Sequence, residues 1–210
     1  MERLAEFVKS VLAGVMISIG GIVFLSSGDN KYVGALAFCV GLISIVLLGM
    51  NLYTGRIGYT VTSDLKQRVD TAISVVGNLV GCVIVGLLSS PVGSVAELCS
   101  KKLEKPWPRV FFDAVMCGVL IYVCVEIYKR HKTVVGIIFC IPTFILCGFE
   151  HSVADMFYFI NGRSISWGSA LFILLVAVGN GVGSILFHLA LLLGKKYGVG
   201  TKEEKKGEAK

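Results

Sequence analysis

The stretch VVGIIFCIPTFILCGFEHSVADMFYF, residues 134–159, combines a long apolar run with ionisable side chains in its second half. These side chains are Glu150, His151 and Asp155. A membrane span needs about 20 mostly apolar residues, and this run is long enough. An ionisable residue inside a span costs roughly 2.5–3.5 kcal/mol on insertion scales, so it is expected to have a function. The fold must therefore hold these groups inside a helix bundle, away from lipid.

The rest of the chain is equally apolar. Of its 210 residues, 55% are hydrophobic and only 16% are charged, and the mean hydropathy is +0.79. A soluble domain of this length could not hide so much apolar surface. Stretches that could span a membrane lie at 7–27, 32–50, 70–90, 108–128, 133–159 and 167–194. These six stretches predict one all-α transmembrane domain over residues 1–197, followed by a disordered charged cytoplasmic tail at 198–210.

The basic residues indicate how the chain crosses the membrane. If both termini are cytoplasmic, the larger share of the 20 Lys and Arg residues lies on the inside, as the positive-inside rule requires. We therefore expect a multi-pass protein of the cell inner (plasma) membrane, and we interpret the net charge of +6 as a sign of topology, not of nucleic-acid binding. The seven cysteines show no CxxC spacing, so neither a metal nor another cofactor is expected.

An internal repeat divides the chain into halves. Three short matches occur in the same order and at nearly one spacing: GVM at 14–16 with AVM at 114–116, LLGMN at 47–51 with LCGFE at 146–150, and GNLVG at 77–81 with GNGVG at 179–183. A repeat of three spans must enter the membrane from opposite sides in its two copies. The sequence thus predicts two inverted three-helix repeats, over about 7–90 and about 108–194, with the functional site between them.

Each repeat has a polar, glycine-containing interruption in its second span. The first is LLGMNLYTGRIGYT at 47–60, which contains Asn51 and Thr54, and the second is CGFEHSVAD at 147–155. Unwound backbone within a membrane is tolerated only where protein or a water-filled cavity satisfies its polar groups. The second and fifth helices are therefore predicted to be broken and to face the bundle interior. Asn180, in the glycine-rich last span, is expected to add an interhelical hydrogen bond or to line the pore.

The polar residues of the fifth span allow more than one role. His151, whose unperturbed pKa is about 6.5, is either a pore or proton-relay residue or a neutral side chain bonded to a neighbouring helix. Glu150 either satisfies the broken backbone or acts on the substrate. Asp155 lies one turn beyond His151, caps a helix, or reaches the membrane interface.

Several of these motifs resemble those of one family. GFEHSVADMF at 148–157 resembles the fifth-helix signature of the formate/nitrite transporter family, which includes hydrosulfide channels. NLYTG at 51–55 resembles its second-helix break, although Asn51 stands where an acidic residue is common. GNLVG and GNGVG resemble its third- and sixth-helix motifs. The resemblance implies an aquaporin-like protomer, a homopentamer with one pore in each protomer, and transport of small monovalent anions of weak acids.

The resemblance also implies roles for individual residues. They are His151 as the central pore histidine, Thr54 on the second-helix break, Leu42 and Leu52 in the cytoplasmic-side constriction, Phe38 and Phe144 in the outer constriction, and Lys105, with Lys102 in reserve, as the outer-vestibule lysine. The apolar constrictions would stop a hydrated ion and pass a neutral molecule. Lys105 would concentrate anions by its field, and His151 would donate a proton to the anion or offer it a positive partner.

Two alternatives belong to other classes of protein. A neutral small-solute channel could share the aquaporin-like fold, although the chain has no Asn-Pro-Ala pair. An intramembrane enzyme would need Glu150, His151 and Asp155 to converge with His131 or His188. The sequence favours a transporter and no enzyme. It leaves open formate, nitrite or hydrosulfide as the substrate, and passive conduction or proton symport as the mode.

Overall fold

The computed structural model describes residues 1–197, and the tail expected at 198–210 lies outside the described residues. The predicted all-α class is confirmed, since this part of the chain forms helices and no strand. The helices are α1 (Glu2–Ser26), α2 (Lys31–Ala37), α3 (Cys39–Leu47), α4 (Tyr53–Arg56), the 3-10 helix η1 (Ile57–Tyr59), α5 (Leu65–Leu88), α6 (Val95–Glu104), α7 (Trp107–His131), α8 (Val135–Leu146), α9 (Ser152–Asn161) and α10 (Trp167–Lys196).

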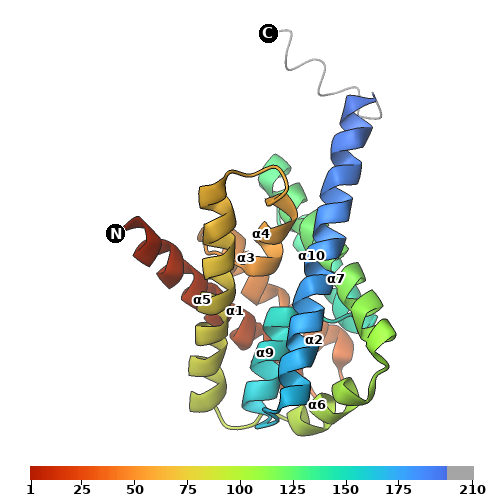
Figure 1. Ribbon diagram of the computed structural model, residues 1–210. Helices are drawn as coiled ribbons and strands as arrows, with labels where there is room; N and C mark the ends of the chain where they lie inside the picture. Colours follow the sequence, from red (N-terminus) through yellow and green to blue (C-terminus); the bar gives the residue numbers. More distant parts are fainter. Residues whose placement is uncertain (198–210) are drawn as a thin grey trace.

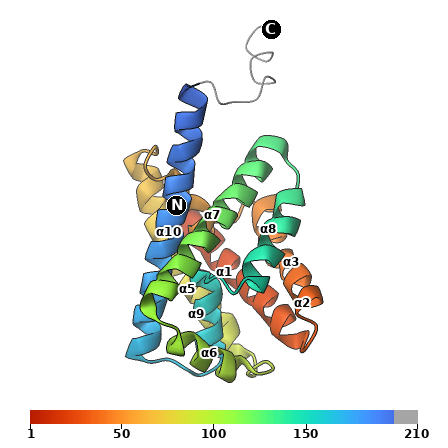
Figure 2. The ribbon, with the colours of Figure 1, turned by 90° about the vertical axis from the view of Figure 1, so that its right-hand side faces the viewer.

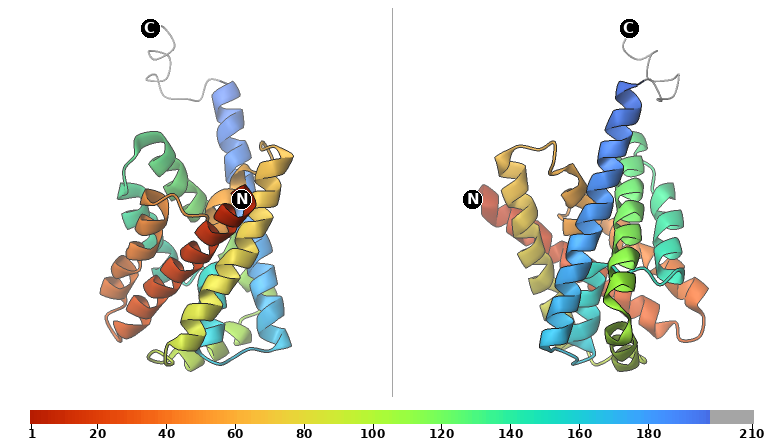
Figure 3. Two further views of the ribbon diagram at one scale, coloured as in Figure 1. Left: turned by 90° about the vertical axis from the view of Figure 1, so that its left-hand side faces the viewer. Right: turned by 45° about the vertical axis from the view of Figure 1, so that its right-hand side comes forward.

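Four helices, α1, α5, α7 and α10, are long and apolar enough to cross a membrane. They pack in pairs, α1 against α5 and α7 against α10 (Figures 1 and 3). The short apolar helices α2, α3 and α8 group on one side of the molecule (Figure 2), while α9 lies between α5 and α10. Side-chain caps fix two of the long helices at their starts: Asp64 accepts the Gln67 amide at 2.8 Å, and Ser166 pairs with Ser169.

Both long pairs depend on glycine at the crossing. A Cβ on Gly14 of α1 would collide with the backbone carbonyl of Asn78, and a Cβ on Gly118 of α7 would collide with that of Asn180. Helices approach this closely only where small residues let the backbones meet. The glycine motifs of the sequence are therefore packing surfaces, and they place Asn78 and Asn180 at matching points of the two pairs.

Both predicted interruptions are present. The chain leaves α3 at Leu47 and becomes helical again at Tyr53, and it leaves α8 at Leu146 and resumes at Ser152. Gly49 and Gly148 have φ values of 64° and 70°, in the left-handed region that glycine adopts without strain. One predicted span differs: the stretch 32–50 is two helices, α2 and α3, which meet at Phe38.

Helix α6 is a feature that was not expected from the sequence. This helix is short and charged, so it does not resemble a membrane span, and its buried residues Val95, Cys99 and Lys102 share one face. It lies at the opposite end of the molecule from α4 (Figure 1). Since α6 carries Lys102, it delivers a lysine to the interior, as described below.

The glycine crossings yield a prediction for stability. We expect Gly118→Ala to lower the melting temperature of the detergent-purified protein, since overpacking of this kind costs about 1–3 kcal/mol. Gly168→Ala is the control, because a Cβ there would have only ordinary contacts. Thermal unfolding followed by tryptophan fluorescence checks this, and equal melting temperatures for the two variants would contradict it.

Candidate pore and substrate site

Two buried asparagines hold the two helix breaks. Asn78 donates to the backbone oxygens of Ser10 and Asn51, at 2.8 and 2.9 Å, and accepts the amide of Tyr53 at 2.9 Å. Asn180 repeats this pattern: it donates to the oxygens of Ala114 and Glu150, at 2.8 and 2.9 Å, and accepts the amide of Ser152 at 2.9 Å. Each asparagine therefore supplies partners for two peptide groups of its break, as the membrane interior demands.

Asn180 was expected to bond another helix or to line the pore. The structure shows the interhelical bonds, and both ends of its side-chain amide are occupied by backbone groups. The signal for this role was present in the matched GNLVG and GNGVG motifs. Asn51, expected at the pore, lines a cavity at the α4 end of the molecule, where its side chain donates to the Glu6 carboxylate at 3.0 Å.

His151 is fixed at the second break by two hydrogen bonds. It is the N-cap of α9, where its Nδ1 atom accepts the Ala154 amide at 3.1 Å. Nδ1 therefore presents a lone pair, and we assign the ring hydrogen to Nε2. Nε2 lies 2.9 Å from Thr54 Oγ1, so the ring donates to the threonine hydroxyl. His151 and Thr54, only 3% and 1% exposed, thus join the two breaks across the centre of the molecule.

Aromatic and aliphatic side chains surround this pair. The Phe144 ring stacks on His151 with centroids 5.8 Å apart, and Phe38 meets Phe144 edge-on at 6.1 Å. Leu42 and Leu52 are also buried. The four residues predicted to form constrictions therefore all belong to the buried apolar core, and Phe144 contacts His151 directly.

Two separate cavities approach this core from opposite ends. The α6-side cavity has a volume of about 150 Å³ and reaches Phe144 and His151. The α4-side cavity has a volume of about 310 Å³ and ends at Leu42 and Leu52. The two share no lining residue, so the buried side chains between them separate the cavities in this conformation.

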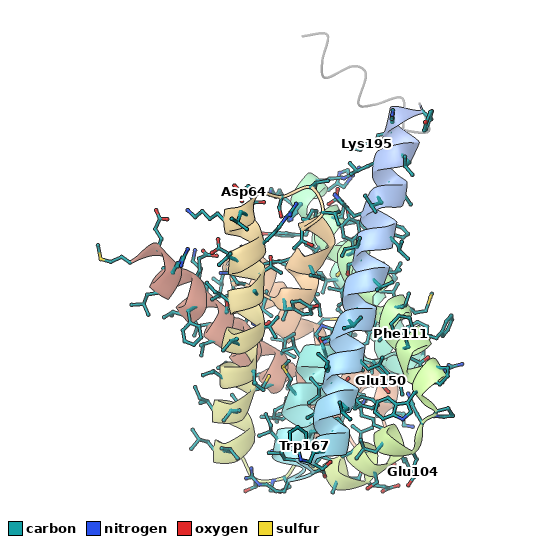
Figure 4. The ribbon with its side chains drawn as sticks, viewed as in Figure 1. Asp64, Glu104, Phe111, Glu150, Trp167 and Lys195 are labelled. Atoms are coloured by element: carbon teal, nitrogen blue, oxygen red, sulfur yellow. The ribbon has the colours of Figure 1, made fainter. Side chains whose placement is uncertain are left out.

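A charge cluster surrounds the α6-side cavity. Lys102 pairs with Glu150 and, at 2.9 Å, with Asp155; Lys105 pairs with Glu150 at 2.6 Å and with Asp113 at 3.3 Å. Figure 4 locates Glu150, whose backbone is bonded to both α7 and α10. Asp155 is thus one turn beyond His151 and bound to Lys102. Glu150 does not bond the central pair; it holds both lysines.

The two lysine candidates differ in exposure. Both line the cavity, but the Lys105 side chain is 31% exposed and that of Lys102 only 11%. Burial by itself would lower the pKa of the Lys102 ammonium, yet Asp155 and Glu150 raise it above its ordinary value. Lys102 is therefore a charged structural partner, while Lys105 faces the open part of the cavity.

The other two histidines lie away from this centre. His131 is exposed at the end of α7. His188 is bonded to Tyr122 and Thr62, at 2.8 and 3.0 Å. The convergence that an enzyme built on these histidines would require is not present in residues 1–197. Arg56 and Lys129 line the α4-side cavity, although their place in the sequence marks them only as basic residues on the cytoplasmic side.

Comparisons with known proteins agree with this geometry. A family model described as formate/nitrite transporter matches residues 1–194. A probable formate transporter of Methanothermobacter thermautotrophicus is 28% identical, over 88% of this chain and 86% of its own. A solved FNT family ion channel superposes with a TM-score of 0.82 at 25% identity, over 93% of this chain and 90% of its own. A pentameric formate channel superposes with a TM-score of 0.68 at 19% identity, over 94% of this chain and 97% of its own.

The asparagine clamp gives a second prediction. Asn180→Leu would leave the Glu150 carbonyl and the Ser152 amide of the break without this partner, each at a cost of about 1–3 kcal/mol. Asn30→Ala, which removes a single bond at the exposed start of α2, should cost about 1 kcal/mol. We expect a much larger fall in melting temperature, or no folded protein, for the first variant. Similar melting temperatures for the two variants would show that the clamp is unimportant.

Proposed function

The chain belongs to the formate/nitrite transporter family, and we propose that it carries small monovalent anions of weak acids (formate, nitrite or hydrosulfide) across a membrane in a proton-linked process centred on His151. The observation that carries this proposal is the His151–Thr54 hydrogen bond, buried between two cavities that open toward opposite ends of the molecule. The family consists of transporters and channels, so we propose no enzymatic activity.

The proposed architecture is six membrane crossings in two inverted repeats, with an aquaporin-like protomer. The matching bonds of Asn78 and Asn180 support the repeat. We propose that α2 with α3, and α8 with α9, form the two broken crossings. We place both termini on the cytoplasmic side of the cell inner (plasma) membrane, and the described likeness to a pentameric formate channel supports a homopentamer.

The apolar core sets the chemical problem that transport must solve. Moving a bare anion into a low-dielectric interior carries a large solvation penalty, whereas a small neutral acid passes at little cost. Phe38, Phe144, Leu42 and Leu52 would impose this penalty on each side of the central pair. The substrate must therefore gain a proton or meet compensating charge between them.

His151 can supply either the proton or the compensating positive charge, and each requires the ring to change its hydrogen bonds. With Nδ1 accepting from Ala154, the neutral ring offers only the Nε2 hydrogen, as a hydrogen-bond donor. To take up a proton at Nδ1, the ring must release the Ala154 amide and give up the cap of α9, which costs about 0.5–2 kcal/mol. We propose that an arriving anion offsets this cost, because it is attracted to the charged ring and to the freed helix N-terminus. The proton, taken from water in the α6-side cavity that reaches His151, then leaves with the substrate as the neutral acid, and the neutral ring recovers the Ala154 amide.

Thr54 and Lys105 would complete the route. Thr54 accepts the Nε2 hydrogen and keeps its own hydroxyl hydrogen for the substrate. Lys105, held at the cavity by Glu150 and the Gly148 carbonyl, would present a positive charge to the anion as it enters.

Uptake into proteoliposomes tests the function. We expect formate, nitrite or hydrosulfide flux to exceed glycerol flux and to rise as the pH falls from about 8 to about 5, since a proton accompanies the anion. His151→Asn keeps an acceptor for the Ala154 amide but removes the titratable ring, so it should fold normally and lose both flux and the pH response. Glycerol flux without anion flux from a folded parent protein would overturn the proposal.

A pair of Thr54 variants tests the central hydrogen bond. Thr54→Val removes the hydroxyl and should lower anion flux about tenfold, the equivalent of one hydrogen bond of about 1.4 kcal/mol. Thr54→Ser keeps the hydroxyl and should retain most of the flux. Initial uptake rates at equal protein density give the comparison, and equal rates for the two variants would remove Thr54 from the mechanism.

A further inference from the structure

A second positively charged mouth lies at the α4 end of the molecule. Arg56 and Lys129 line both the α4-side cavity of about 310 Å³ and a neighbouring cavity of about 260 Å³. Leu42 and Leu52, which belong to the buried apolar core, line the α4-side cavity as well. Anything collected in this cavity would therefore stand directly before the apolar core.

Lys129 is held in place without an ion pair in the described structure. Its Nζ atom lies 3.3 Å from the centroid of the Tyr59 ring, and no carboxylate of residues 1–197 lies within 4.0 Å of it. The neighbouring carboxylate, Glu126, accepts the Tyr59 hydroxyl at 2.6 Å and pairs with Arg130 at 2.6 Å. A ring face attracts an ammonium group but carries no net charge to cancel it.

Arg56, in contrast, is balanced by an acid. It pairs with Glu6 at 2.9 Å, and the same carboxylate oxygen accepts Asn51 at 3.0 Å. This bonding fixes Arg56 at the side of the cavity. Lys129 therefore supplies the excess positive charge of this mouth, and Arg56 adds donors at a fixed position.

The two mouths differ in their balance of charge. The α6-side cluster contains three cations and three carboxylates: Lys102, Lys105 and Arg109 with Asp113, Glu150 and Asp155. If all six are ionised, their formal charges cancel. A partly enclosed cavity with an unbalanced cation raises the local concentration of anions more strongly than a neutral cluster does.

A lysine at the end of an apolar helix is often only a topology signal or a contact for lipid headgroups. Such a lysine needs neither a cavity nor a fixed aromatic support. Lys129 has a cavity beside it and the Tyr59 ring beneath its ammonium group, and Leu42 and Leu52 line the same cavity.

We propose that Lys129 and Arg56 form a second anion-binding site, which takes a small monovalent anion at the α4 end before it meets the Leu42 and Leu52 barrier. The role of this site in transport rests on the proposed function, whereas its ability to bind an anion does not. The site would serve substrate arriving from the side opposite Lys105.

Binding is tested on the purified protein in an uncharged, lipid-free detergent. An amine-acylating reagent is applied with and without sodium formate, and the rate of modification at each lysine is read by mass spectrometry. We expect formate to slow the modification of Lys129 roughly threefold to tenfold, with Lys31 unchanged as an exposed internal reference. If modification of Lys129 slows only when anionic phospholipid is added, Lys129 contacts lipid headgroups and the proposal is overturned. Equal rates of modification at Lys129 with and without formate would overturn it too.

The role in transport is tested with a matched pair of variants. Lys129→Gln should raise the formate concentration for half-maximal flux roughly threefold to tenfold from the α4 side and leave flux from the Lys105 side unchanged. Lys66→Gln removes the same charge from the exposed start of α5, outside both cavities, and should change neither. Membrane vesicles of the two orientations give the two directions.

The two experiments separate the two proposals. A parent protein without anion flux would overturn the proposed function, while the labelling result would still decide whether Lys129 binds an anion. A parent protein with flux, but with no protection of Lys129 and no directional effect of Lys129→Gln, would overturn the second site alone.

Discussion

Broken helices inside an apolar bundle impose one requirement on this protein: each released peptide group must find a partner there. Asn78 and Asn180 each bond two peptide groups of a break and one carbonyl of a neighbouring long helix, across crossings that only glycine permits. Once the breaks are held, their polar ends face each other. His151 and Thr54 are then close enough to bond, although they come from opposite halves of the chain.

The same breaks place charge and hydrocarbon in a fixed order along the molecule. A cluster of paired lysines and carboxylates lies at the α6 end, an apolar core surrounds the central pair, and a lysine that forms no ion pair within residues 1–197 lies at the α4 end. In the proposed function an anion is attracted at either end, and the low-dielectric core excludes it unless its charge is reduced or offset. This order of charge, barrier and central hydrogen-bond donor suits a weak acid, which can exchange its charge for a proton.

Much of this arrangement was predictable from short segments of sequence. Of the six spans predicted from apolar length, four are helices long enough to cross a membrane within residues 1–197, and glycine beside polar residues indicated both breaks. Other features were not predictable in this way. The helix α6 is too short and too charged to read as a span, and nothing local to Lys102 shows that it enters the bundle to meet Asp155 and Glu150. Lys129 looked like a topology signal because its support, Tyr59, lies far away in the sequence.

The sequence by itself determined the membrane character, the helical class, the two breaks and the residue types at the centre, because each follows from composition or from neighbours within a few positions. Only the tertiary structure decided which groups pair. It placed the Ala154 amide against Nδ1 of His151, bonded Asn180 to backbone groups, and left Lys129 without an ion pair within residues 1–197. These outcomes depend on contacts between residues far apart in the chain, where the energy of a polar group is set by the partner that folding brings to it.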